Sequence, residues 1–141
     1  GRDSQRTPMQ WEPTEMAGFT TGEPWLPLGP ELAKRNVQVQ ESDPASLLNF
    51  WRNLVWLRKK KSALLEGTYQ SITESIPEDC YVFTRIQAPK SMLICLNFSR
   101  KSRTLPLPGK ISPLFSTHNL RNKKPAETLT LAPLEGCLLE F

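Results

Sequence analysis

From Thr68 to its C-terminus, the chain alternates between short apolar runs and turn-forming segments. The runs are rich in β-branched, aromatic or alternating apolar residues and cover 68–73, 80–86, 91–98, 102–107, 111–116, 128–131 and 136–141. Pro, Gly, Asn and Asp mark the breaks between them, at 76–79, 88–90, 108–110, 119–125 and 132–133. Short runs at roughly ten-residue spacing predict a mainly β fold, an antiparallel β-sandwich or barrel-like sheet. The run 92–96 is wholly apolar and predicts a central strand.

One long amphipathic helix is expected before the β region. Ser42, Asp43 and Pro44 form a start signal, because Asp43 can accept a hydrogen bond from a free N–H and proline suits the first helical position. Apolar residues then recur at helical spacing, and the helix is expected to end near Lys61, with an extra turn at 63–65 and a break at Gly67. Before this helix, residues 36–40 are predicted to be a short extended piece.

This helix is unusually apolar for its length. Its stripe includes Trp51, Leu54 and Val55, flanked by Phe50 and Leu57. Such a face packs on a large partner surface, and an exposed apolar patch is prone to association. Self-association of the chain through the helix face is therefore one expectation.

The first 41 residues follow neither a helical nor a strand period. They contain three aromatic motifs: RTPMQW at 6–11, AGF at 17–19 and PWLP at 24–27. Five prolines in this region fix φ and remove backbone donors, so the segment should be irregular but stiff. Its aromatic residues predict an ordered loop that lies against a larger body, since a disordered linker would carry few of them.

Composition and charge exclude several classes of protein. The three cysteines, Cys80, Cys95 and Cys137, form no CxxC pair, so neither a metal site nor a cofactor is expected; they are expected to be buried thiols in a reducing cytosol. The net charge of +4 comes from basic residues scattered over 59–61, 100–103 and 121–124, a distribution that does not favour nucleic-acid binding. Apolar runs are too short to span a bilayer and no signal-peptide pattern opens the chain, so a cytoplasmic location is expected.

Four segments together carry a family resemblance. RDSQRTPMQW, AGFTTGEPWLP, NVQVQESDPASLLNFWRNLVWLRKKKSALLEGTY and LICLNFS occur in this order and span most of the chain. They resemble the C-terminal part of glycoside hydrolase family 13, the α-amylase family. The branch with the greatest similarity contains α-glucosidases, oligo-1,6-glucosidases, trehalose-6-phosphate hydrolases and trehalose synthases.

The resemblance implies how the chain is organised. Residues 1–66 would be the loop after the eighth strand and the last helix of a truncated catalytic (β/α)8 barrel, and 67–141 an all-β C-terminal domain. The implied function is the C-terminal portion of a retaining α-glucosidase that acts on short α-linked glucosides. The implied partner is the missing barrel of the same polypeptide, which the β-domain stabilises.

The resemblance also implies a site residue. In this branch the arginine of RTPMQW, here Arg6, reaches the sugar next to the nucleophile, and a guanidinium fork suits sugar hydroxyls. The alternative is that Arg6 pairs with Asp3 or binds local carbonyls. Trp11 and Trp25 are expected to be buried anchors of the loop. None of the fourteen Asp and Glu lies in a catalytic motif, so the chain alone is expected to be inactive.

Other readings remain open. Heavy chains of heteromeric amino-acid transporters share this C-terminal architecture without glycosidase activity. A free-standing carbohydrate-binding β-sandwich would use Tyr69, Tyr81 and Phe83, although strand positions favour core packing. His118 beside hydroxyls is weak evidence for a triad. The sequence Asn97-Phe98-Ser99 is a glycosylation site only in a secreted chain.

Overall fold

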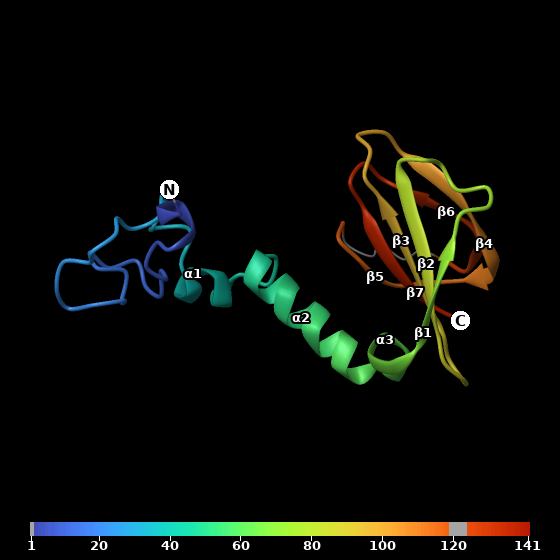
Figure 1. The fold of residues 1–141 in the computed structure, drawn as a ribbon, viewed down its shortest axis with the longest axis horizontal. Coiled ribbons are helices and arrows are strands. Elements are labelled where there is room, and N and C mark those ends of the chain that lie inside the picture. Colours follow the sequence, from blue (N-terminus) through green and yellow to red (C-terminus); the bar gives the residue numbers. More distant parts are fainter. Residues whose placement is uncertain (1, 119–123) are drawn as a thin grey trace. The chain divides into compact units, whose positions relative to one another are not determined.

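The computed structural model describes residues 2–118 and 124–141, and its contacts divide the chain into two compact units, Gly1–Leu57 and Arg58–Phe141 (Figure 1). The expected break at 119–125 and the basic residues 121–123 lie largely or wholly outside the described residues. The helical elements are a 3-10 turn and three α-helices: η1 (Asp3–Gln5), α1 (Val37–Ser42), α2 (Leu47–Lys60) and α3 (Ser62–Glu66). None of the described helices has the length and apolar character needed to cross a membrane.

The described residues of the second unit form seven antiparallel strands in two sheets. Strands β1 (Thr68–Ile72), β2 (Cys80–Ile86), β3 (Met92–Asn97), β5 (Pro113–Ser116) and β7 (Gly136–Glu140) form one sheet in the order β1-β2-β3-β7-β5. Strands β4 (Arg103–Ile111) and β6 (Ala126–Leu131) form the other (Figure 1). The mainly β, antiparallel fold expected from the sequence is confirmed, and the apolar run 92–96 is the central strand β3.

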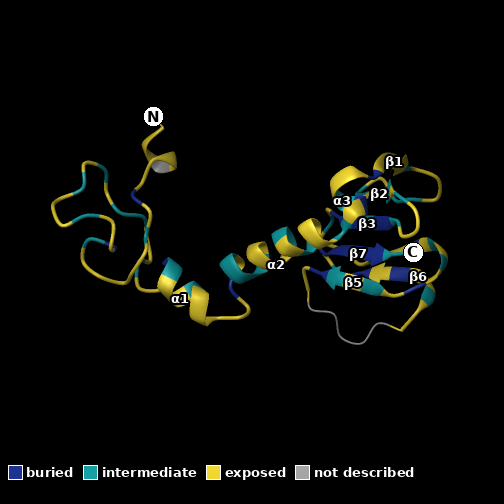
Figure 2. Cartoon of the chain, turned by 90° about the horizontal axis from the view of Figure 1, so that it is seen from below, coloured by how far each residue is buried: buried dark blue, intermediate teal, exposed yellow. Residues whose placement is uncertain are grey.

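One face of each sheet contributes to a shared core. Alternate residues of β2, β3 and β7 pack against the inward residues of β4 and β6, as period-two alternation requires. The buried cluster consists of Val82, Leu93, Cys95, Leu105, Ile111, Leu129, Leu131, Cys137 and Leu139. Figure 2 shows this burial concentrated in β3 and β7, at the middle of the larger sheet.

The break predicted at 108–110 is wrong. Residues 103–111 form the single strand β4, whose register against β6 shifts between Pro106 and Ile111. Pro106, Pro108 and Gly109 are tolerated there because β4 belongs to a two-stranded sheet, and proline occurs in strands at edges and irregular positions.

The helix start is also corrected. Asp43 accepts a hydrogen bond from the Ala45 N–H at 2.9 Å, but this bond closes a turn before the helix. Helix α2 begins at Leu47, and its cap is Ser46, whose hydroxyl accepts the Asn49 N–H at 3.2 Å. The end at Lys60 and the short α3 before Gly67 match the prediction.

Helix α2 contains no buried residue. Leu47 is 75% exposed, and Trp51 and Trp56 are each 61% exposed. An apolar helix without a covered face leaves the expected partner surface open in this chain.

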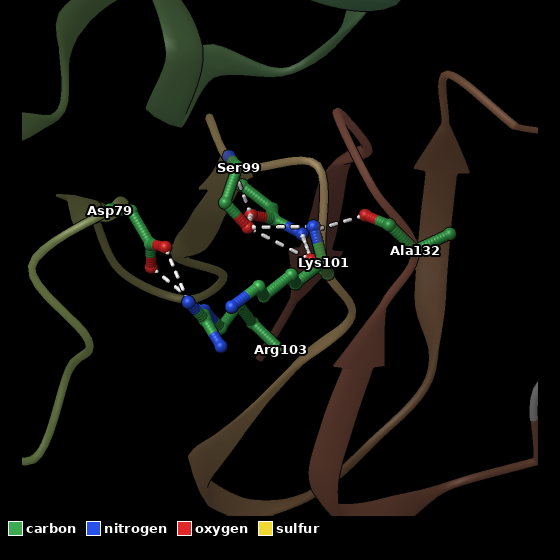
Figure 3. A network of polar contacts seen from close by, with 6 residues as sticks. Asp79, Ser99, Lys101, Arg103 and Ala132 are labelled. Atoms are coloured by element: carbon green, nitrogen blue, oxygen red, sulfur yellow. Dashed lines mark hydrogen bonds and ion pairs between the residues drawn. The ribbon is translucent and has the colours of Figure 1, made fainter.

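A polar network closes one end of the sandwich (Figure 3). Asn97 is 3% exposed, and its amide nitrogen donates to the Lys101 and Ala132 carbonyls at 2.8 Å each. Its Oδ1 accepts the N–H and the hydroxyl of Ser99 at 2.9 and 2.8 Å. The Asn97-Phe98-Ser99 sequence therefore has a structural role in the described chain, because the amide that a glycan would need is buried and bonded.

Two carboxylates join elements that are distant in sequence. Arg103 donates Nε and Nη2 to the two oxygens of Asp79 at 2.8 and 2.6 Å, a bidentate pair between β4 and the start of β2 (Figure 3). Glu140 on β7 accepts from Lys61 and, at 2.8 Å, from Lys90. The hydrogen bond from Arg103 lowers the pKa of Asp79, and those from Lys61 and then Lys90 lower the pKa of Glu140.

Replacing Asn97 should destabilise the chain strongly. Asn97→Ala leaves the carbonyl of Ala132 and the N–H of Ser99 without their partner and removes one of the two donors to the Lys101 carbonyl, which keeps the Ser99 hydroxyl. The expected cost is about 3 kcal/mol in the free energy of unfolding. Asn53→Ala, at an exposed position of α2, is the control and should change that free energy by less than about 0.5 kcal/mol. Urea unfolding followed by circular dichroism measures both. A loss below about 1 kcal/mol for Asn97→Ala would contradict the role of the network.

Acid should weaken the chain through Asp79 and Glu140. Because the folded-state pKa values of both groups are lowered, their contribution to stability is present above the unfolded-state pKa values and is lost as the pH falls through the folded-state values. The melting temperature should therefore fall progressively as the pH drops below about 5, just above the ordinary pKa values of these carboxyl groups. Glu140→Gln should reduce this dependence, and Glu74→Gln, at an exposed position, should preserve it. Equal pH profiles for Glu140→Gln and the unsubstituted chain would refute the contribution of Glu140.

Candidate functional site

The RTPMQW segment is fixed by backbone bonds to the start of α1. The Val37 and Gln38 N–H groups donate to the carbonyls of Gln10 and Trp11, each at 3.0 Å. The first N–H groups of a helix have no partner within the helix, so these two carbonyls satisfy groups that would otherwise be unbonded. These two hydrogen bonds therefore stabilise both the conformation of the motif and the first turn of α1.

Asn36 completes this arrangement. Its Oδ1 accepts the Val39 N–H at 2.9 Å, which makes it the cap of α1, and its Nδ2 donates to the Leu32 carbonyl at 2.7 Å. The side chain is 1% exposed. The extended structure predicted for 36–40 is wrong, because the alternating Val and Gln suggested a strand whereas the cap and the distant carbonyls stabilise a helix.

The AGF motif is bonded directly to RTPMQW. The Ala17 carbonyl accepts the N–H groups of Trp11 and Glu12 at 2.8 and 3.1 Å. Ala17 is fully buried, and both Ala17 and Gly18 adopt positive φ, 55° and 63°. The turn thus returns the chain to the motif.

The three aromatic motifs line one hollow of about 300 Å³ within the first unit. Its wall consists of Arg6, Thr7, Pro8, Met9, Phe19, Pro24, Trp25 and Leu26. The structure therefore brings together segments that the sequence analysis singled out separately. The prediction that Trp11 and Trp25 are buried is wrong for this chain, since they are 48% and 93% exposed. Among the described residues, Trp25 is left almost uncovered, whereas about half of the Trp11 surface is covered.

Arg6 lies exposed at this hollow. Its backbone N–H donates to the Asp3 carbonyl at 3.0 Å, at the end of η1. Among the side chains that the structure describes, which exclude that of Ser4, the Arg6 guanidinium has no ion-pair or hydrogen-bond partner, so the alternative pairing with the Asp3 carboxylate is not seen. A guanidinium in this state presents its donors to solvent beside two exposed aromatic rings.

The other chemically interesting residues take part in the β core. Cys95 and Cys137 face each other across β3 and β7, and burial raises the pKa of Cys95 to about 12. Both thiols are buried, as expected, whereas Cys80 is half-buried. The Cys137 thiol lies 3.3 Å from Oε1 of the buried Glu135. The raised pKa therefore keeps the Cys95 thiol neutral in the core.

His118 takes part in no triad geometry. Its Nδ1 lies 2.9 Å from the Thr117 hydroxyl, whereas the Ser116 hydroxyl donates to Glu135 at 2.6 Å. The Glu135 carboxylate also accepts the Ala132 N–H at 2.7 Å. Within the described ranges, no cluster of three or more His, Cys, Asp or Glu is arranged to hold a metal ion.

The chain is similar in sequence to known enzymes over most of its length. The family model described as alpha amylase, catalytic domain, matches residues 1–67. The chain is 35% identical to an oligo-1,6-glucosidase from Parageobacillus thermoglucosidasius over 96% of its own length and 25% of that enzyme. It is 36% identical to the trehalose-6-phosphate hydrolase of Escherichia coli over 71% of its length and 18% of that enzyme.

Solved structures show the same correspondence. The crystal structure of the trehalulose synthase MutB from Pseudomonas mesoacidophila MX-45 superimposes with a TM-score of 0.86 and 33% identity, over 99% of this chain and 26% of MutB. A MutB variant in complex with the substrate sucrose gives the same TM-score and identity. The chain therefore spans about a quarter of the length of these relatives.

Removing the α1 cap should loosen the candidate site. Asn36→Ala removes a bond worth about 1–2 kcal/mol to the helix start, so local opening should become roughly 5- to 30-fold more frequent. Trypsin cleavage after Arg6 should accelerate accordingly, measured by mass spectrometry at short times. Asn53→Ala is the matched control and should cleave at the unsubstituted rate. Equal cleavage rates in Asn36→Ala would show that the cap does not hold the motif.

Proposed function

We propose that this chain is the C-terminal portion of a retaining α-glucosidase that acts on short α-linked glucosides, because its sequence and its fold both match about a quarter of α-amylase family (glycoside hydrolase family 13) enzymes. The observation that carries the proposal is the extent of the match. The chain aligns over 96–100% of its length with relatives of which it covers only 25–26%. A free-standing module would be expected to match whole proteins or isolated domains instead.

The two parts of the chain have different roles. Residues 1–66 supply the loop and last helix of the catalytic barrel, and 67–141 form the β-domain that stabilises it. Support comes from the catalytic-domain match, which ends at Gly67, where α3 ends and β1 follows at Thr68. The exposed aromatic face of α2 suits a barrel wall as its partner.

None of the carboxylates in this chain is assigned a catalytic role. Retaining hydrolysis needs two carboxyl groups about 5–5.5 Å apart, one as nucleophile and one as acid/base. Asp79 and Glu140 are engaged in ion pairs, and Glu135 is buried in the β core. The catalytic carboxylates of the full enzyme therefore belong to the barrel, and the isolated chain is inactive.

Arg6 is the residue through which this chain contacts substrate. Its side chain is exposed beside Phe19 and Trp25 at the edge of the same hollow. A guanidinium donates to two hydroxyls of one sugar at once, and a neighbouring aromatic ring packs on the apolar face of a pyranose. The names of the relatives point to small substrates, because they include oligo-1,6-glucosidases and trehalose-6-phosphate hydrolases.

A cytoplasmic location accompanies this function. Cys95 and Cys137 lie directly opposite each other on β3 and β7 and are not joined by a disulfide. Opposed thiols persist in a reducing compartment, which supports the cytoplasm over an oxidising space.

A chimera tests the function and the role of Arg6. In it, this chain replaces the corresponding quarter of the Parageobacillus thermoglucosidasius oligo-1,6-glucosidase, and hydrolysis of isomaltose is measured. The unsubstituted chimera should be active. Arg6→Ala should lower kcat/KM by about 10- to 100-fold, since a hydrogen bond from a charged donor is worth about 1.5–3 kcal/mol.

Arg35→Ala is the matched control and should preserve kcat/KM, because Arg35 pairs with Glu31 on the surface. An inactive chimera made with a well-folded chain would contradict the proposed function. An active chimera that is insensitive to Arg6→Ala would remove Arg6 from the site and leave the enzyme class intact.

A further inference from the structure

The two sheets have four edge strands among the described residues, namely β1 and β5 in the larger sheet and β4 and β6 in the smaller. Proline or an ionic side chain lies in three of them: Pro106 in β4, Pro113 in β5 and Glu127 in β6. Such residues discourage pairing with another chain, because proline removes a backbone donor and a charge resists burial. Strand β1, with the sequence TYQSI, contains neither, so its edge is the least protected of the four.

Strand β1 is open to solvent and yet held in place. Four of its five residues, from Thr68 to Ser71, are exposed. The hydroxyl of Tyr69 lies 2.5 Å from that of Tyr81, and the ring centres of Tyr69 and Phe83 are 5.4 Å apart. Tyr69 and Tyr81 are nevertheless 48% and 42% exposed, so the expected core packing is wrong for both tyrosines. The strand therefore needs little further ordering to pair with a partner.

The hydrogen-bond pattern of the larger sheet identifies the backbone groups of β1 that point away from it. Between β3 and β7 the odd-numbered residues are bonded, since the Asn97 N–H donates to the Glu135 carbonyl at 2.9 Å. Because bonding alternates along an antiparallel strand, the even-numbered residues of β3 bond to β2. Through the register, the odd-numbered residues of β2 then bond to β3 and its even-numbered residues bond to β1. In β1 the even-numbered residues therefore face β2, whereas the N–H and C=O groups of Tyr69 and Ser71 face away from the sheet.

We propose that β1 pairs antiparallel with β1 of a second copy of this chain, so that the larger sheets of the two copies join at their edges. Outward N–H and C=O groups on an uncovered edge strand are a template for a further strand. The pairing is isologous, because each copy offers the same groups, those of Tyr69 and Ser71, to the other. This inference goes beyond the proposed function and does not depend on it.

Charge selects the register of this pairing. With the twofold axis at Gln70, Glu66 of one copy would lie opposite Glu74 of the other, and like charges directly opposite each other destabilise a strand pair. With the axis at Ser71, each Glu74 lies opposite the uncharged Thr68 of the other copy. Ser71 then exchanges two hydrogen bonds with its counterpart. The axis at Ser71 therefore satisfies the outward groups and avoids the repulsion, which makes the strand complementary to itself.

Analytical ultracentrifugation of the chain measures this association. The unsubstituted chain should form a dimer as its concentration rises. Ser71→Pro removes the N–H at the centre of the interface and leaves the bonds between β1 and β2 in place, so the dissociation constant of the dimer should rise roughly tenfold or more. Ser71→Ala keeps this N–H, and as the matched control it should dimerise like the unsubstituted chain. Circular dichroism should show that both variants retain the β fold.

A second variant and a contact across the interface give independent readouts. Ser71→Lys keeps the N–H but places two ammonium groups opposite each other, so it should also weaken the dimer. In a mixture of isotope-labelled and unlabelled chains, an NMR cross-peak should link the Hα atoms of Gln70 in one copy and Ile72 in the other. These two residues form a pair without mutual hydrogen bonds, in which the backbones approach most closely. Labelling only one of the copies excludes a contact within one chain.

Three results would overturn the pairing. The first is a chain that stays monomeric at every concentration. The second is association that Ser71→Pro and Ser71→Lys leave unchanged, which would assign the contact to another surface, such as the exposed face of α2. The third is a dimer that lacks the cross-peak between Gln70 and Ile72. None of these results changes the activity expected of the chimera, which tests the proposed function separately.

Discussion

The apolar surface between the two sheets is fully buried, whereas the apolar surfaces of the N-terminal loop and of α2 are largely exposed. The inward residues of the two sheets close a core in which Leu105, Leu131 and Leu139 are fully covered. By contrast, Trp25 is 93% exposed and α2 has no buried residue. The hydrophobic effect makes such surfaces costly to leave in water. The same exposure appears in the loop aromatics of the first unit and along α2, and the catalytic barrel proposed as the partner would cover both.

The candidate site depends on a backbone arrangement rather than on side-chain chemistry. Gln10 and Trp11 supply carbonyls to the first N–H groups of α1, and Asn36 supplies the third acceptor. This fixes the residues that follow Arg6, whose guanidinium remains exposed. A loop stiffened in this way can offer a cation to a substrate without first paying the entropy of ordering.

The sequence predicted the elements whose causes are local. Alternation in 80–86 defined β2 with its observed bounds, and the apolar run 92–96 defined the central strand. Helix α1 was missed because two of its cap acceptors lie 27 positions earlier in the chain, at Gln10 and Trp11. Strand β4 was divided because Pro108 and Gly109 normally end a strand, and only the small, two-stranded sheet makes them tolerable.

The site was predictable only through the resemblance. The residue pattern suggested that Trp25 and Tyr81 were buried, because large aromatics usually are, and a sequence does not show which of its apolar residues find a partner within the same chain. The exposure of these side chains in the structure therefore supports a partner surface that the residue pattern alone did not indicate. The Arg6 assignment, in turn, gained an exposed guanidinium and a hollow from the structure, while its contact with a sugar remains a proposal.

The size of the native polypeptide tests the central claim most directly. An antibody raised against residues 67–141 would detect the protein in an extract of its source cells, and denaturing electrophoresis would give its mass. The account predicts a polypeptide about four times the 16.0 kDa of this chain, because the chain spans 25% of its relative's length. A stable native product of 16.0 kDa would contradict it, since the exposed surfaces would then have no barrel to cover them.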